Sequence, residues 1–294
     1  MDVLITGAAG RVGTAITEHL SGEEYDFTLL DVVEADGPGE TVVADVREYE
    51  AIRPSFEGQD AVVHLALVNE DDEFTPGSRG VGWSADLQSN LEGINNVYEA
   101  AVDAGLDSIV FASSNHAVGM VEVRNAPGIY HDEGTVAGHD EPHRPDSRYG
   151  LSKAYGEDLG RLAAEAHGIG FYGLRIGAVR EPRYDHPYGD AERGVDEGRF
   201  ERGSDAYEEQ VARMKGLWQS RRDLAQLVEC CLQDDTVFPY TTLFRSVEWD
   251  HFYGLSANDR RWLDDLAYAK ETIGYDPRDN GEEWDAPPET PAED

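Results

Sequence analysis

The glycine-spaced segment TGAAGRVG, residues 6–13, leaves few folds open to this chain. An apolar run, DVLIT, leads into it, and an amphipathic stretch over residues 12–20 follows. Gly7 permits a tight turn, Gly10 lets a ligand approach the backbone, and Gly13 lets a helix pack closely against a strand. The segment therefore predicts a strand, a turn and a helix whose first N–H groups face a bound anion.

The chain up to residue 177 repeats this alternation of short apolar runs and amphipathic stretches. Strands separated by helices form parallel sheets with right-handed crossovers. The pattern predicts an α/β fold, a Rossmann-type doubly wound parallel sheet with a small C-terminal lobe. We expect further strands at 26–31, 41–45, 60–67, 108–113 and 170–177, and helices at 86–104 and 149–167.

Asp31 ends the second expected strand, 18 residues after Gly13. A carboxylate there accepts hydrogen bonds from ribose hydroxyls and repels a 2′-phosphate, so the sequence favours NAD over NADP. Asp45 and Val46, after the third strand, are expected beside the adenine, and Asp45 is equally suited to capping the next helix. The residues expected to bind NAD are Gly7, Gly10, Arg11, Val12, Gly13, Asp31, Asp45, Val46, Leu65, Ala66, Tyr149 and Lys153.

Three domains or segments follow from these patterns. Residues 1–177 are expected to form the NAD-binding domain, 178–276 a small substrate-binding lobe, and 277–294 a loose acidic tail. Within the lobe, the polar residues 181–207 are expected to form a long excursion. A helix at 220–233, a strand at 249–256 and a helix at 260–274 are also expected.

The segment TVFPYTTLFRS, residues 236–246, contains no acidic residue in a chain where acids are dense. It closely resembles the translation of a common sequencing adapter. Our hypothesis is that residues 238–246 are an insertion of that origin. The alternative is a native apolar β-hairpin, and resequencing the source DNA across this junction separates the two.

Tyr149 and Lys153 are spaced i,i+4, so on a helix they share one face. Tyrosine has a pKa of ~10, and lowering it by about three units costs ~4 kcal/mol. An ammonium ~4–5 Å away supplies about that much at an effective dielectric near 20. A compact ammonium can also reach ribose hydroxyls, which explains a lysine here in a chain where arginine serves elsewhere.

Ser114 lies in FASSNHAVG, at the end of the fifth expected strand, where side chains of a parallel sheet face a ligand. Together with the glycine turn, Asp31, Asn90 and the Tyr149/Lys153 pair, it resembles the extended short-chain dehydrogenase/reductase family. The segments SSNHAVG, YGLSKAYGEDLGR, LRIG, RMKGLWQSRRD and GLSANDRRW are most similar to uronate dehydrogenases and the related haloarchaeal NAD-dependent glucose-6-phosphate dehydrogenase. The resemblance covers about residues 1–280.

This resemblance implies a role for each matching side chain. Tyr149 would be the base, Ser114 would hold the substrate hydroxyl, and Lys153 would tune Tyr149 and bind ribose. The resemblance places Asn90 in the proton-relay region, Asn115 and His116 on sugar oxygens, and Arg213 on a uronate carboxylate. The implied reaction is NAD-dependent oxidation of the C1 hydroxyl of a hexose derivative, a uronate or a hexose 6-phosphate, to a lactone.

Two other functions remain open. A nucleotide-sugar epimerase or dehydratase shares the Ser/Tyr/Lys group, but it recycles tightly bound NAD and makes no net NADH. A non-catalytic NAD-sensing regulator typically lacks the Tyr/Lys pair. The sequence departs from the uronate enzymes at Ala178, in the loop 69–85 and in the long segment 181–212, all bordering the expected sugar site.

Two further clusters of chemically active residues occur. Arg213, Lys215, Arg221 and Arg222 are the basic cluster of the second half, suited to a carboxylate or phosphate, or else a solvated face. His139, Asp140, Glu141 and His143 form a polar loop without a fourth-ligand pattern, so no metal site is predicted there.

The net charge of −36 argues against nucleic acid or anionic membrane as partners. Acid excess with few lysines resembles proteins of salt-accumulating haloarchaea, and we expect loss of structure at low salt, where carboxylate repulsion is unscreened. Cys230 and Cys231 are adjacent and ill suited to a structural disulfide, which favours a reducing cytoplasm. The expected partners are a small sugar substrate and a second copy, paired through the helices 86–104 and 149–167.

Overall fold

The computed structural model describes residues 1–20, 24–68, 85–131, 137–234 and 249–289. The suspected insertion 238–246 and nearly all of the loop 69–85 lie outside these residues. Seven parallel strands of the described chain form one sheet in the order β3-β2-β1-β4-β5-β6-β7. The strands are β1 (Asp2–Thr6), β2 (Asp26–Asp31), β3 (Glu40–Val43), β4 (Ala61–His64), β5 (Ser108–Phe111), β6 (Gly170–Ile176) and β7 (Trp249–Gly254).

The central strands of this parallel sheet are buried on both faces. Val3–Ile5, β4 and β5 are buried along continuous apolar runs, as expected for strands covered by helices on each side. The helices are α1 (Arg11–His19), α2 (Tyr49–Ile52), α3 (Ala85–Ala104), α4 (Met120–Asn125), α5 (Arg148–His167), α6 (Gly189–Asp196), α7 (Asp205–Leu217), α8 (Arg221–Gln233) and α9 (Leu266–Ile273). The predicted fold class is confirmed.

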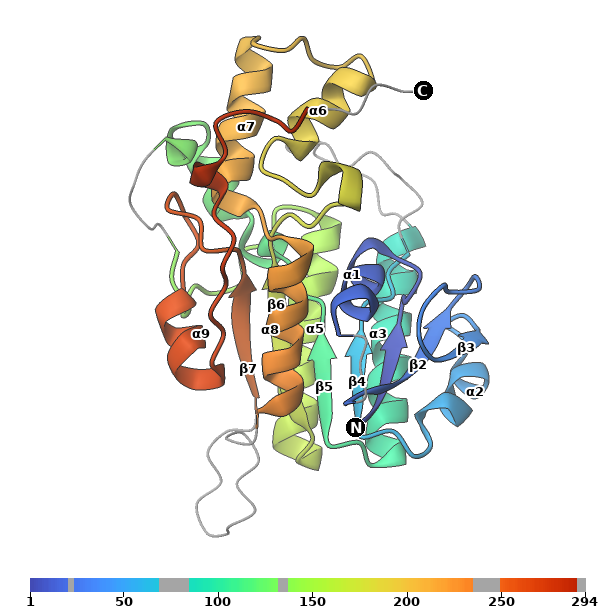
Figure 1. Ribbon diagram of the computed structural model, residues 1–294. Helices are drawn as coiled ribbons and strands as arrows, with labels where there is room; N and C mark the ends of the chain where they lie inside the picture. The colour runs from blue at the N-terminus through green and yellow to red at the C-terminus, as the bar shows by residue number, and fades with distance from the viewer. Residues whose placement is uncertain (21–23, 69–84, 132–136, 235–248, 290–294) are drawn as a thin grey trace.

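Helices cover both faces of the sheet (Figure 1). On one face, α1 and α8 pack side by side, and α9 joins the same apolar core. On the other face, α3 and α5 pack together over a second core that α2 also enters. This arrangement brings α1, α3 and α5 to the carboxyl edge of the strands, where the chain turns carry the candidate site residues.

The helix α5 has clear sequence signals at both ends. Ser147 is its N-cap, and the hydroxyl accepts a hydrogen bond from Gly150 N at 3.0 Å. Gly168 ends it with φ +73°, a left-handed conformation that favours glycine. Tyr149 and Lys153 therefore lie in the first two turns of a well-defined helix.

Of the expected C-terminal lobe, α6 and α7 lie beyond the carboxyl ends of the strands, whereas β7 belongs to the sheet and α8 and α9 pack on it (Figure 1). The long excursion expected over 181–207 contains α6 and the start of α7. The helix predicted for 260–274 is shorter, because residues 260–265 pair with other segments instead. Ala137 N donates to Trp262 O, and Asp264 N donates back to Ala137 O, each at 3.0 Å.

The tail expected to be loose is held over residues 278–284, which contact the start of α8 and residues beside α6 and α7. The ring of Trp284 stacks on His186 and meets Trp218 edge-on. The carboxylate of Asp223 accepts hydrogen bonds from the backbone N–H groups of Arg278 and Asp279, each at 3.0 Å. Within the described chain, helices are all too short or too polar to cross a membrane.

Candidate active site

The glycine turn after β1 has the geometry that its spacing predicts. Gly7 has φ +73°, and a Cβ there would lie 2.6 Å from the backbone N of Ala66. A Cβ on Gly13 would lie 2.4 Å from Ala8 O. Both contacts are too close for any side chain. Glycine is therefore required for the turn to approach the strand β4 and for α1 to pack on the turn.

The amino end of α1 is built to meet an anion. Its N-cap is Gly10, and no side chain of the described structure caps the helix there. The first-turn N–H groups of a helix have no partner within the helix, and the helix dipole is positive at this end. A phosphate is therefore well suited to this position.

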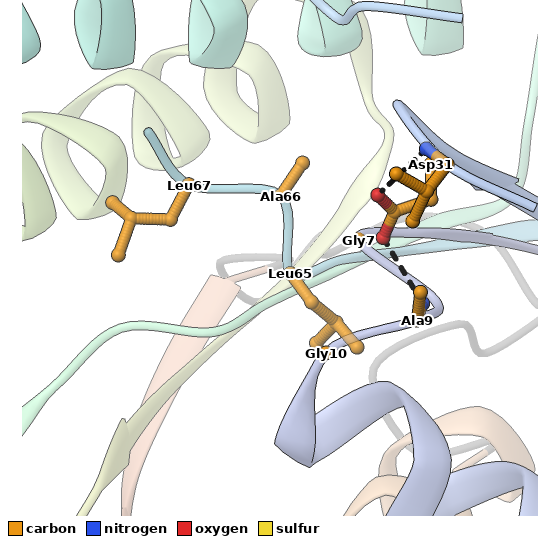
Figure 2. Close-up of a pocket in the computed structure, with 8 residues that line it drawn as sticks. Gly7, Ala9, Gly10, Asp31, Leu65, Ala66 and Leu67 are labelled. Atoms are coloured by element: carbon orange, nitrogen blue, oxygen red, sulfur yellow. Dashed lines mark hydrogen bonds between the residues drawn. The ribbon is translucent and has the colours of Figure 1, made fainter. Parts of the chain in front are cut away.

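A cavity of about 370 Å³ opens beside this turn. In Figure 2, Asp31 lies on one side of it and the chain after β4 lies opposite. The Asp31 carboxylate accepts hydrogen bonds from Ala9 N at 3.0 Å and Val32 N at 2.7 Å, so it is held at the rim. The residues lining the cavity are Gly7, Ala9, Gly10, Asp31, Val33, Leu65, Ala66 and Leu67. The close turn at Gly7, the uncapped amino end of α1 and the fixed carboxylate of Asp31 are together suited to bind a dinucleotide.

Four residues predicted to bind the cofactor have side-chain contacts elsewhere in the chain, and their cofactor contacts stay predictions. Arg11 pairs with Glu181 at 3.2 Å, and Val12 packs against the core. Asp45 is held by Arg47 at 2.6 Å, and Val46 is buried in the core under α3. Within the described chain, the lining of the cavity leaves out all four, so an adenine contact from Asp45 or Val46 stays a prediction.

Ser114, Tyr149 and Lys153 meet at the carboxyl edge of β5. Ser114 caps the short helix η2 (Asn115–Val118), and its hydroxyl accepts from His116 N at 3.2 Å. A hydrogen bond joins Ser114 to the hydroxyl of Tyr149. Lys153 Nζ is buried, 5.5 Å from the ring centre of Tyr149 and 5.0 Å from that of Phe111.

In the structure, the surroundings of Tyr149 raise its pKa, whereas the sequence predicted a lowered one. Burial raises the pKa of Tyr149, the hydrogen bond from Ser114 lowers it, and the charge of Asp146 raises it. Burial also lowers the pKa of Lys153, to about 7. The prediction counted the attraction between ammonium and phenolate but left out the desolvation that both groups suffer.

Asp146 is a site residue that the sequence reasoning missed. Its Oδ2 lies 2.7 Å from Nδ1 of His116, and both side chains are largely buried. The ring of His116 meets that of Tyr149 edge-on, with centres 5.7 Å apart. A Cβ on Gly119 or Gly150 would collide with Asp146 or with His116 O, so two glycines make room for this contact. The available signal was an acid just before the helix that carries Tyr149.

Glu157, one turn after Lys153 on α5, anchors this helix to the sheet. It accepts from Arg175 Nη2 at 2.9 Å, lies 2.7 Å from His143 Nε2, and accepts from the hydroxyl of Ser113. Burial alone would raise the pKa of Glu157, but His143 and Arg175 outweigh this effect and lower the pKa to about 2. The buried carboxylate is thus ionised and compensated.

Asn90 and Asn115 are buried near the ends of β4 and β5. Asn90 Oδ1 accepts from Val68 N at 2.8 Å, and its Nδ2 donates to Val68 O at 3.1 Å. It thereby holds the chain that leaves β4 beside the cavity. Asn115 Oδ1 accepts from the hydroxyl of Ser114 at 3.4 Å. The relay role of Asn90 and the sugar contact of Asn115 remain predictions.

The predicted basic cluster does not converge on one point. Arg213 forms a buried ion pair with Glu122. Lys215 Nζ lies 3.6 Å from Glu282. Arg221 lies 2.7 Å from Glu18, and Arg222 lies 2.7 Å from Asp279. Each of these four cations is therefore paired with an acidic side chain of the same chain.

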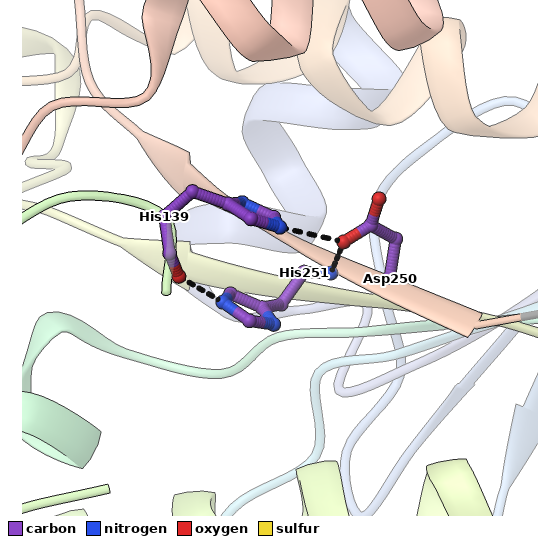
Figure 3. A group of neighbouring side chains, drawn as sticks. All are labelled: His139, Asp250 and His251. Carbon is purple, nitrogen blue, oxygen red and sulfur yellow. Dashed lines mark hydrogen bonds and ion pairs between the residues drawn. The ribbon is translucent and has the colours of Figure 1, made fainter. Parts of the chain in front are cut away.

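The histidines of the polar loop separate into two places. His143 joins Glu157, whereas His139 joins Asp250 and His251 of β7 (Figure 3). The ligand atoms of His139, Asp250 and His251 lie within 4.8 Å of one another. However, the two imidazole rings are stacked, 4.5 Å apart and 7° from parallel, whereas one metal would have to lie in both ring planes. The contacts describe an ion pair and a ring stack.

The fold and this geometry define a class: α/β proteins that bind a dinucleotide at the carboxyl edge of a parallel sheet. Residues 3–196 match the NAD dependent epimerase/dehydratase family. The chain belongs to that family.

Several relatives cover nearly the whole chain. An NAD-dependent glucose-6-phosphate dehydrogenase from Haloferax volcanii is 35% identical over 293 residues, which is 96% of this chain and 95% of that protein. An L-arabinose 1-dehydrogenase (NAD(P)(+)) from the same organism is 35% identical over 285 residues, 95% of this chain and 96% of that protein.

A solved relative is a uronate dehydrogenase mutant from Agrobacterium tumefaciens complexed with NAD. It is 27% identical, with a TM-score of 0.69, and the match covers 99% of this chain and 92% of that one. The predicted family, the NAD cofactor and the prediction of an NAD-dependent dehydrogenase are confirmed. The roles predicted for single side chains remain predictions.

Proposed function

We propose that this protein oxidises the C1 hydroxyl of a cyclic aldose, a hexose or hexose derivative, to a lactone with NAD. The observation that carries the proposal is the Ser114–Tyr149–Lys153 group beside the glycine turn. The relatives named for glucose 6-phosphate, L-arabinose and uronates support a sugar as substrate.

The side chains supply binding and proton transfer. Ser114 orients the C1 hydroxyl, and Tyr149 takes its proton as the base. Asp31 and the amino end of α1 hold the ribose and pyrophosphate of NAD. Bound NAD supplies the hydride acceptor and a positive charge that favours the ionised form of Tyr149.

Lys153 is tuned by its burial. With a pKa of about 7, it is partly protonated at neutral pH and stabilises the tyrosinate only in its charged form. We therefore expect the reaction to require a bound cofactor that offsets the desolvation of this pair.

Replacing Tyr149 tests the base. The variant Tyr149→Phe keeps the ring and the packing, and it should lower kcat by about 10²- to 10⁴-fold, the usual contribution of a general base. The measurement is NADH absorbance in molar KCl with several aldoses, together with NAD titration by fluorescence. Retained NAD binding with lost turnover supports the proposal, whereas full turnover by Tyr149→Phe contradicts it.

The epimerase alternative predicts a different outcome of the same assay. Such an enzyme would interconvert UDP-glucose without net NADH. A non-catalytic NAD-sensing regulator would bind NAD and turn over no sugar. Net NADH from an aldose separates our proposal from both.

A further inference from the structure

Arg213, the residue that the family resemblance assigns to a substrate carboxylate, already forms a buried ion pair within the chain. Nε and Nη2 of Arg213 donate to the two carboxylate oxygens of Glu122 at 2.5 and 3.2 Å. The hydroxyl of Tyr130 also donates to Glu122, at 2.8 Å. The side chains of Arg213 and Glu122 are only 7% and 6% exposed. One bidentate face of the guanidinium is thus already filled from within the chain.

This pair borders the expected sugar site. Glu122 lies on α4, which directly follows the short helix η2 that carries His116. The charge of His116 contributes to lowering the pKa of Glu122, which places the two groups within electrostatic reach. Arg213 lies one turn before the end of α7, where Leu217 O accepts from Ala178 N just beyond β6.

Both members of the pair are ionised. Burial raises the pKa of Glu122, but the charge and hydrogen bonds of Arg213 lower it below its ordinary value. Burial lowers the pKa of Arg213, and Glu122 raises it well above its ordinary value. Asp190 also lies within electrostatic reach of Arg213, and it is itself paired with Arg180 and Arg193. A substrate carboxylate would therefore meet a guanidinium that is already neutralised, and a buried excess anion is costly.

A phosphate meets the same obstacle. Lys215, Arg221 and Arg222 are the other cations from which a phosphate site could be built here. All three are matched with acids: Glu282, Glu18 and Asp279 respectively. A dianionic phosphate would compete with these carboxylates for the same cations.

We propose, on the basis of the dehydrogenase function above, that the substrate is an aldose without a charged group and that Glu122 is the residue that rejects uronates and sugar phosphates. The carboxylate of Glu122 binds Arg213 in the place that a carboxylate of the substrate would otherwise take. The Arg213–Glu122 pair offers hydrogen bonds to sugar hydroxyls and no net positive charge.

The test compares kcat/KM for glucose, L-arabinose, glucuronate and glucose 6-phosphate, measured as NADH in molar KCl. The wild-type protein should prefer a neutral aldose over glucuronate by about 100-fold, because an uncompensated buried charge is strongly unfavourable. Glu122→Gln keeps the shape and an acceptor oxygen while freeing the charge of Arg213. It should shift the ratio toward glucuronate by about tenfold or more.

Glu99→Gln, on the exposed side of α3, is the matched control and should leave the ratio unchanged. Wild-type preference for glucuronate or glucose 6-phosphate overturns the inference and leaves the dehydrogenase function standing. An unchanged ratio in folded Glu122→Gln overturns it as well. If that variant does not fold, the wild-type ratio alone decides. No NADH from any sugar, with NAD binding intact, overturns the proposed function itself.

Discussion

A single carboxylate, Asp146, joins the two segments that carry the candidate catalytic groups. It contacts His116 of η2 at 2.7 Å and accepts from the hydroxyl of Ser147, the N-cap of α5, at 2.8 Å. A carboxylate that accepts a hydrogen bond from Nδ1 fixes the orientation of the imidazole ring and leaves Nε2 for the expected sugar contact. Asp146 is thus a positioning residue for a histidine that is expected to contact the sugar.

The variant Asp146→Asn tests this role. An amide holds Nδ1 of His116 less firmly and admits the other tautomer, so kcat/KM for the sugar should fall about 10- to 100-fold. The dissociation constant for NAD should not change, because Asp31 and the glycine turn are untouched. A purely structural role would instead lower the melting temperature and weaken NAD binding in parallel, and that result would contradict the assignment.

Local patterns predicted the glycine turn, Asp31 and the Tyr149/Lys153 pair, because each is defined by residues close in sequence. The partners of His116 and Arg213 could not be predicted in this way. Asp146 is 30 residues from His116, and Glu122 is 91 residues from Arg213. Only the folded chain shows that these side chains are in contact.

The segment 137–145 crosses from the substrate lobe to the outer strand β7. Its first residue, Ala137, pairs with Leu263, and His139 pairs with Asp250 and Asp265 at 3.2 and 3.5 Å. The ring of His139 also packs on Tyr268 of α9, with centres 4.0 Å apart. His139 thus fastens this segment to both β7 and α9.

The pH dependence of stability should report this contact. Burial lowers the pKa of His139, but Asp250 and Asp265 raise it more, from 6.5 to about 9. A raised folded-state pKa stabilises the protein while the histidine is protonated in the folded state. This stabilisation is full below pH 6.5 and is lost as pH rises through 9.

Chemical denaturation in molar KCl, measured between about pH 6 and about pH 9.5, checks this expectation. Lys153 and the other groups titrate alike in both proteins, so the contribution of His139 is the difference between the wild type and His139→Gln. Across this range, the free energy of unfolding of the wild type should fall relative to that of His139→Gln by on the order of 1–3 kcal/mol. Parallel profiles for the two proteins would show that His139 does not carry the effect.

The helices α6 and α7 show why the lobe was harder to predict than the sheet. Their apolar core is small, with Tyr188, Ala191, Tyr207 and Val211 buried in it. Charge pairs hold much of the rest, such as Arg180 with Asp190 at 2.5 Å. The eight residues of α6, GDAERGVD, include few apolar side chains, so this helix gives a weak signal in the sequence.

The net charge of −36 destabilises the folded protein as a whole, because its carboxylates repel one another. At ~1 M salt the Debye length is ~3 Å, so carboxylates on the surface hardly repel one another, whereas at ~0.1 M it is ~10 Å. We expect the far-UV circular dichroism to be native in about 2 M KCl and largely lost at about 0.1 M. Adding NAD at low salt should restore part of the signal, because ligands stabilise the folded state. An unchanged melting temperature across this range would contradict the expectation.

We expect hydride to leave C1 of an aldose and to reach NAD without returning. Turnover of a C1-deuterated aldose, with mass spectrometry of the nicotinamide product, tests it most directly. We predict one deuterium in the reduced cofactor and a lactone, or its hydrolysis product, that carries none. Deuterium retained in the sugar, with no net reduced cofactor, would contradict the claim and favour an epimerase.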